Sequence, residues 1–170
     1  MNKAIELTSA RVLLAAENPY EAMSLVAEMT GSPVERQFLG ALVTCKKEWW
    51  TFSPGEGDAL PHLIIHKNDH EYAIWQQVPC AGYVLDFLVM ASCGDDRFVP
   101  LDVEIDGHDF HDRTKEQASH DRRRDRTLLK LGTRTIRFTG SDIFRDARAC
   151  ADEVYELLDT LLSDEGVAVQ

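Results

Sequence analysis

The chain has 170 residues, 44% of them hydrophobic, and a formal net charge of -11. This size fits one domain with a substantial apolar core, so folding requires neither disulfides nor a structural metal. No stretch approaches the roughly 18 to 20 apolar residues of a membrane span, and no signal-peptide pattern is present. We therefore expect a cytoplasmic protein without membrane contacts, whose four cysteines are free thiols.

The negative charge is unevenly distributed along the chain. Between Arg113 and Arg148, eleven Lys and Arg residues stand against five Asp and Glu, a local balance of +6 that leaves -17 for the remainder. A local basic surface, rather than total charge, decides whether a protein contacts phosphate. Two interpretations stay open: a nucleic-acid interface, or a solvated helix face whose charges pair at spacings of three and four residues.

The beginning of the chain is predicted to be helical. Residues 1–30 form a helical extension in this interpretation, followed by one domain over 31–163 and a tail over 164–170. Ser32 is a helix cap, Pro33 occupies the first helical position and Glu35 falls in the first turn. A loop rich in Gly, Pro, Ser and acids follows at 53–61.

The middle of the chain has the composition of strands, and its end returns to helices. β-Branched and aromatic residues predict strands over 62–67, 71–78, 82–90 and 98–106. A helix is expected over 112–131 with Gly132 as its C-terminal cap, then a strand over 133–138 and a helix capped by Ser141. This order predicts an α/β fold: a mixed central sheet flanked by helices, with one crossover between strands.

Asp86 is an unusual residue for its position, because it lies inside the apolar strand YVLDFLVM. A buried carboxylate is costly unless it is paired, hydrogen-bonded or bound to a cation. The segment offers no helix to cap. A metal-binding role and an ordinary structural role remain about equally favoured by this residue alone.

The second unusual segment is PLDVEIDGHDFHD, in which Asp102, Glu104 and Asp106 share one face of a strand. Such carboxylates either line a solvated edge or need a cation, and Mg²⁺ prefers oxygen ligands. Hairpin pairing of 82–90 with 98–106 places Asp86 near Glu104 on the same face. We expect Asp86 to be buried and Glu104 to open onto a cleft.

Together these segments resemble the PD-(D/E)XK nuclease superfamily, most closely its branch related to very-short-patch-repair endonucleases and small bacterial E-x-D-G proteins. The resemblance covers roughly 33–162 and rests on SPVERQFLGAL, IWQQVPCAGYVLDF, VEIDGHDFH, HDRRRDRTLLKLG and TIRFTGSDIF. It implies a restriction-endonuclease-like αβββαβ core and hydrolysis of DNA with Mg²⁺ or Mn²⁺.

The resemblance also implies roles for individual residues. Asp86, Glu104 and Asp106 would bind the metal, and Glu35 would order water or a second ion. Asp106 stands where many members of the superfamily have Lys, so either Lys115 supplies the positive charge or the domain has lost cleavage and only binds nucleic acid or a protein.

The expected contacts with DNA come from the same resemblance and from the basic segment. They are Gln77, His108, His111, Arg113, Arg122, Arg123 and Arg126. The two histidines could instead ligate metal, carry a proton, or simply cap the next helix. A homodimer that cuts both strands is a further expectation, and a non-nuclease metal enzyme is a weaker alternative.

Overall fold

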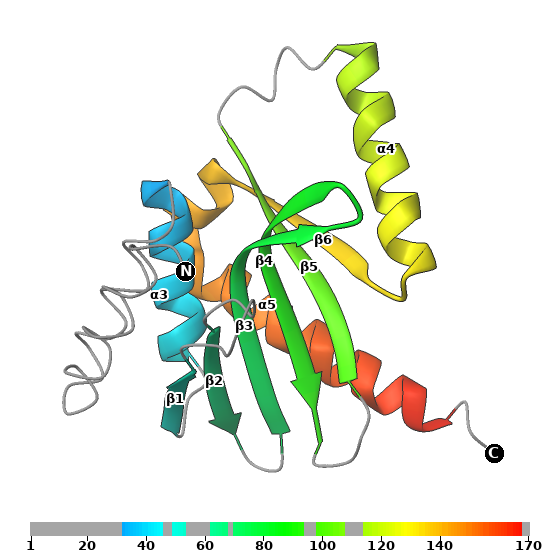
Figure 1. Cartoon of the computed structure of the whole chain (residues 1–170). Coiled ribbons are helices and arrows are strands. Elements are labelled where there is room, and N and C mark those ends of the chain that lie inside the picture. Colours follow the sequence, from blue (N-terminus) through cyan, green and yellow to red (C-terminus); the bar gives the residue numbers. More distant parts are fainter. Residues whose placement is uncertain are drawn as a thin grey trace, which may run out of the picture.

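The computed structural model describes residues 32–45, 49–53, 62–67, 70–93, 98–107 and 114–167. The elements follow one another along the chain as α3 (Pro33–Cys45), β1 (Trp49–Ser53), β2 (His62–Lys67), β3 (His70–Cys80), β4 (Tyr83–Ser92), β5 (Phe98–Asp106), α4 (Lys115–Lys130), β6 (Arg134–Thr139) and α5 (Gly140–Val167) (Figure 1). The predicted extension over 1–30 lies outside these residues, whereas α5 continues into the segment predicted as a tail.

Six strands form one sheet in the order β1-β2-β3-β4-β5-β6. Neighbouring strands are antiparallel except β5 and β6, which are parallel and are joined by the crossover helix α4. The α/β fold class and the αβββαβ core order are therefore confirmed. Strand β1 was not predicted, because its five residues are too short for a clear alternating pattern.

The main core lies between the sheet and the helices α3 and α5. Alternating residues of the central strands face it, among them Phe87 and Val89 of β4 and Leu101 and Val103 of β5, all fully buried. Phe38 of α3 meets the Phe87 ring edge-on at 5.5 Å between centroids. Because side chains alternate along a strand, the residues between these core positions face the opposite side of the sheet.

Helix α4 packs beside β6, and its buried residues are Arg124 and Leu128. The helix begins at Lys115 rather than at residue 112, and Thr114 caps it in a reciprocal capping box with Gln117. Gly132 ends it with φ +81°, as predicted. At the tip of the β3–β4 hairpin, the Tyr83 ring contacts His120 of α4. The helix is thereby held against both its neighbouring strand and the hairpin.

The predicted cap of the last helix was wrong by two residues. Thr139 accepts from the backbone of Asp142, and the Asp142 carboxylate accepts from the Thr139 backbone, so Thr139 is the cap in place of Ser141. Further along, Asp146 interrupts α5 with φ -160° and ψ 82°, and its carboxylate accepts from Ala149 N–H as the helix resumes. Within the described residues, no helix is long and apolar enough to cross a membrane.

Candidate active site

The hydrogen-bond ladders of the sheet are interrupted at Asp86. On the β3 side the paired residues step from Gln76↔Phe87 to Val78↔Leu85, and on the β5 side pairing ends at Phe87↔Val103. Carboxylates replace the missing ladder bonds: Asp86 N–H donates to Glu104 Oε1 at 3.1 Å, and Ile105 N–H donates to Asp86 Oδ2 at 2.9 Å. The expected approach of Asp86 to Glu104 on one face is therefore present.

Arg124 of α4 binds the two buried carboxylates of β5. Its Nη1 and Nη2 donate to Glu104 Oε2 and Oε1, and Nη2 also lies 3.2 and 3.0 Å from the two oxygens of Asp102. Asp102 is 0% exposed and Glu104 is 8% exposed. The interpretation of this strand as a solvated edge is therefore wrong, because a basic helix covers it.

Glu104 was predicted to open onto a cleft, and this prediction was wrong. Glu104 is buried, whereas Asp86 is only half-buried. The reason is the docking of α4, whose Arg124 lies over Glu104 and leaves Asp86 at the interrupted end of the ladder. Asp86, rather than Glu104, is the more accessible of the pair.

Glu35 joins this group from α3, as predicted for an acid in the first turn of its helix. Burial, followed by the nearby charge of Asp86, raises the pKa of Glu35 above its ordinary value. Burial also raises the pKa of Asp86, with the charge of Glu104 adding to it. Three carboxylates therefore lie close enough to repel one another, which is a surrounding that favours a cation.

Gln77 was predicted to contact DNA, and the structure places its amide against Glu35, with Nε2 donating to Oε2 at 3.2 Å. The side chain is exposed. Its backbone has φ +51°, a conformation that non-glycine residues adopt rarely and at a cost of about 1 to 2 kcal/mol. Strain at Gln77 thus coincides with the interruption of the ladder opposite Asp86.

Asp106 lies at the end of β5, with Arg137 of β6 beside it. Arg137 Nη1 is 3.9 Å from Asp106 Oδ1, and Nη2 donates to Asp125 of α4 at 2.6 Å. The charge of Asp106 also contributes to the raised pKa of Asp86, after burial and Glu104. We call Glu35, Asp86, Asp102, Glu104 and Asp106 the acidic cluster; Arg124 and Arg137 are cations that contact it.

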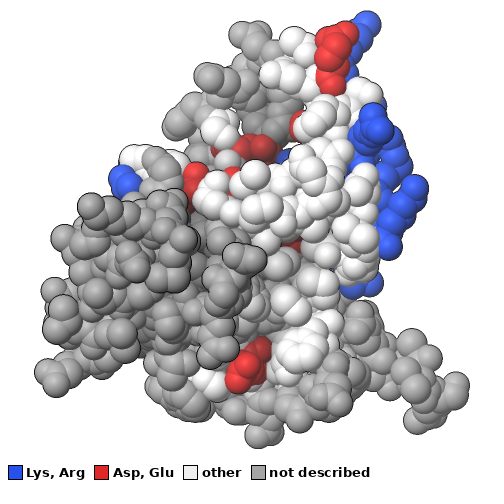
Figure 2. Space-filling view, viewed as in Figure 1, with Lys and Arg blue, Asp and Glu red and all other residues white. Residues whose placement is uncertain are grey.

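The remaining arginines of α4 point to solvent. Arg122, Arg123 and Arg126 are exposed, and so is Lys115 at the first position of the helix. Figure 2 shows Lys and Arg gathered along the outer side of α4, with acidic side chains recessed beside it. The structure thus brings the basic helix next to the acidic cluster, while no described contact joins Lys115 to it. His108, His111 and Arg113 lie outside the described residues.

Oxygen donors of the acidic cluster suit a hard divalent cation such as Mg²⁺ in their chemistry and in their excess of negative charge. In the part of the chain that the structure describes, however, no group of three or more His, Cys, Asp or Glu is arranged ready to hold a metal ion. Both oxygens of Glu104 accept hydrogen bonds from Arg124. The donor chemistry thus suits a divalent cation, but in the observed arrangement Arg124 engages Glu104.

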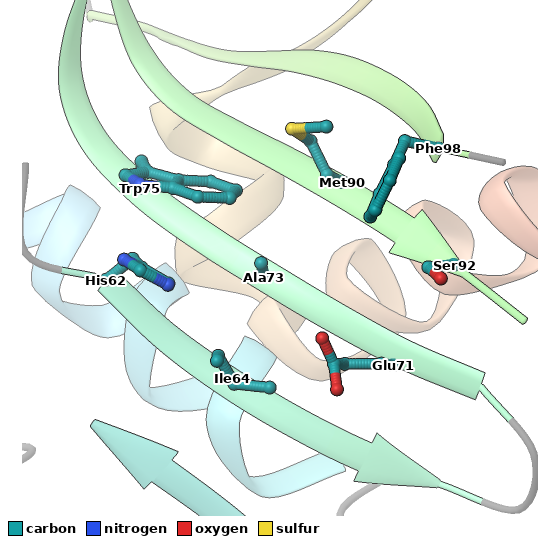
Figure 3. Close-up of a pocket in the computed structure, with 8 residues that line it drawn as sticks. All are labelled: His62, Ile64, Glu71, Ala73, Trp75, Met90, Ser92 and Phe98. Carbon is teal, nitrogen blue, oxygen red and sulfur yellow. The ribbon is translucent and has the colours of Figure 1, made fainter. Parts of the chain in front are cut away.

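A small pocket of about 140 Å³ lies on the same face of the sheet as the acidic cluster, but toward the other ends of β4 and β5. Figure 3 shows its lining, which includes Trp75, Met90 and Phe98. The His62 ring stacks on Trp75 at 4.5 Å between centroids. None of the acidic-cluster residues lines this pocket.

The mixed sheet, its parallel pair joined by α4, and the acidic strands beside that helix define a restriction-endonuclease-like fold. The model of REase_MTES_1575, a restriction endonuclease-like family, matches residues 64–158. The match covers more than half of the chain, and the chain belongs to this family. It includes the acids of β4 and β5 and the whole of α4, but not Glu35. No curated protein and no solved structure matches the chain.

Sequence reasoning did not single out Asp102 and Arg124 among the site residues. Asp102 was recognised only as a third acid on the face of Glu104. Arg124 was hidden in a run of arginines, although it stands four residues before Leu128, the other buried residue of α4. That spacing, which places both residues on one face of a helix, was the signal available.

Proposed function

We propose that the chain is a Mg²⁺- or Mn²⁺-dependent endonuclease that hydrolyses phosphodiester bonds in DNA, with Asp86 and Glu104 as its main metal-binding carboxylates. The observation that carries this proposal is the interruption of both ladders at Asp86, where the carboxylates of Asp86 and Glu104 cross-link the two strands. Membership in a restriction endonuclease-like family supports the reaction class.

Four residues of the acidic cluster have distinct parts in this proposal. A bound divalent ion would polarise the phosphate and lower the pKa of the attacking water. Asp86 is the more accessible acid and would be the one nearer the substrate. Glu104 is buried and fixes the position of Asp86 by accepting a hydrogen bond from its backbone N–H. Glu35, whose pKa is raised by burial and by Asp86, is suited to order or deprotonate a water. Asp106 would act through a water or a second ion.

The DNA backbone would lie along α4. Arg122, Arg123 and Arg126 are exposed there, beside the recessed acids, and could bind successive phosphates. Lys115, at the start of the helix, would supply positive charge near the phosphate. The other proposed contacts with DNA are Gln77, His108, His111 and Arg113. This proposal also includes a relation to very-short-patch-repair endonucleases, a cytoplasmic location and a homodimer that cuts both strands.

A second candidate is a catalytically silent module that binds nucleic acid or a protein partner through the same fold. One observation favours it: Arg124 binds both oxygens of Glu104, and an arginine already neutralises that carboxylate without any metal. Asp106 in place of the usual Lys points the same way. In this candidate the acidic cluster is purely structural.

The two candidates are separated by incubating the purified chain with supercoiled plasmid, single-stranded DNA and branched DNA, each with Mn²⁺, with Mg²⁺ and with EDTA. The proposal predicts cleavage of at least one substrate that requires the metal. DNA binding without cleavage of any substrate under any of these conditions would establish the silent module instead.

A further inference from the structure

Arg124 contacts Glu104, one of the two carboxylates that the proposed function assigns to a metal ion. Its two terminal nitrogens donate to both oxygens of Glu104. One of these oxygens also accepts from Asp86 N–H at 3.1 Å. A divalent ion binds a carboxylate through the same oxygen lone pairs. These hydrogen bonds fill three of the roughly four acceptor positions of the carboxylate, so an ion that binds both oxygens of Glu104 has to displace Arg124.

Arg124 has a second partner that the proposed metal site does not use. Nη2 lies 3.2 and 3.0 Å from the oxygens of Asp102, which is fully buried. Thr135 of β6 fixes this carboxylate by donating its hydroxyl to Oδ2 at 2.9 Å. Asp102 can thus retain the guanidinium after Glu104 is released, without leaving a buried charge alone.

The observed position of Arg124 also leaves one donor unused. Its Nε is buried and has no hydrogen-bond partner among the described residues. A buried donor without a partner raises the energy of an arrangement relative to one in which that donor is satisfied. Arg124 therefore binds Glu104 through charge-assisted hydrogen bonds, but not all of its own donors are satisfied in this position.

We propose that Arg124 is a displaceable internal cation of the active site. Anchored on Asp102, it neutralises Glu104 while no metal is bound, and it gives up Glu104 when a divalent ion arrives. This inference rests on the proposed function. It assigns Arg124 a positioning role that controls metal occupancy, and it explains how buried acids can be held in place before the metal binds.

The test is the affinity of the full-length chain for Mn²⁺, measured by titration calorimetry, with the Mn²⁺-induced shift in melting temperature as a second readout. Arg124→Lys keeps the charge but loses the planar fork that engages both carboxylates. We expect its Kd for Mn²⁺ to fall roughly fivefold or more, in the range typical of two coupled binding events. Arg124→Gln should lower the Kd further and enlarge the melting-temperature shift.

Arg148→Lys, an equivalent change at an exposed position of α5, is the matched control and should leave the Kd unchanged. A Kd for Arg124→Lys that equals or exceeds that of the wild type overturns the inference, and this variant decides the matter if Arg124→Gln does not fold. Glu104→Gln separates the two proposals: if it binds Mn²⁺ as well as the wild type does, the proposed metal site itself is wrong.

Discussion

At the scale of single residues, Asp102 and Glu104 share one guanidinium, so two buried carboxylates compete for one positive charge. Burial and the neighbouring charge of Glu104 raise the pKa of Asp102 to about 7. Burial pushes the pKa of Glu104 upward as well, but hydrogen bonds with Arg124, Asp102 and the Asp86 N–H, together with the charge of Arg124, outweigh burial and lower that pKa below its ordinary value. Asp102 is therefore the acid that takes up a proton near neutral pH.

This assignment predicts how stability depends on pH without metal. Since the folded protein binds the Asp102 proton more tightly than the unfolded chain does, the contribution of Asp102 is complete below its ordinary pKa of 3.8 and is lost as the pH rises through about 7. The contribution of Asp102 to the free energy of unfolding should thus fall between about pH 4 and 7, by on the order of 1 kcal/mol per pH unit at most.

Asp102→Asn removes the titrating group and keeps its shape. In urea melts in EDTA across this pH range, the free energy of unfolding of the wild type should fall relative to that of the variant as the pH rises. Parallel curves for the two proteins would mean that Asp102 does not titrate there.

At the scale of elements, the ends of α4 depend on local sequence: a capping box at Thr114 and a glycine with positive φ at Gly132. Such signals can be read from neighbouring residues alone. The strands 62–67 and 98–106 also agree with their predicted bounds. The docking of Arg124 on Asp102 could not be predicted in the same way, since it joins residues 22 positions apart that meet only after the crossover is formed. The burial of Glu104 under Arg124 has a similarly non-local cause, whereas β1 was missed because its five residues are too short for a clear alternating pattern.

Two glycines provide a paired prediction about helix backbones. Gly132 has φ +81°, so Gly132→Ala should destabilise the fold by about 1 kcal/mol through strain alone, because no atom lies within 4 Å of the added Cβ. Gly40 lies inside α3 with equal space around it, so Gly40→Ala should stabilise by roughly 0.5 to 1 kcal/mol. Chemical denaturation measures both; shifts of the same sign would contradict the backbone assignment.

The exposed arginines of α4 predict the salt dependence of DNA binding. Replacing Arg122, Arg123 and Arg126 together by Gln should weaken binding and reduce the slope of log affinity against log salt by about 0.9 for each duplex phosphate that the variant no longer neutralises. Arg148→Gln, on the exposed side of α5, is the single-site control and should change little. An unchanged slope in the triple variant would remove α4 from the interface.

At the scale of the whole molecule, the two faces of the sheet differ in what covers them. The helices α3 and α5 bury the apolar side, and the other side carries the acids of β4 and β5 beneath α4. The net charge of -11 does not exclude the proposed contact with DNA, because five exposed cations lie together on α4. The sequence allowed the fold class and the pair of Asp86 and Glu104 to be predicted, since both depend on strand patterns and one hairpin.

The central claim is that Asp86 and Glu104 carry metal-dependent cleavage, and it is tested by cutting supercoiled plasmid in Mn²⁺ with Asp86→Asn and Glu104→Gln. The exposed Glu116→Gln serves as the control for removal of one carboxylate. We predict that both site variants bind DNA as the wild type does, yet cleave it roughly 100-fold more slowly or worse, because several kcal/mol of transition-state stabilisation are lost. Cleavage by folded Asp86→Asn at the wild-type rate would contradict the account.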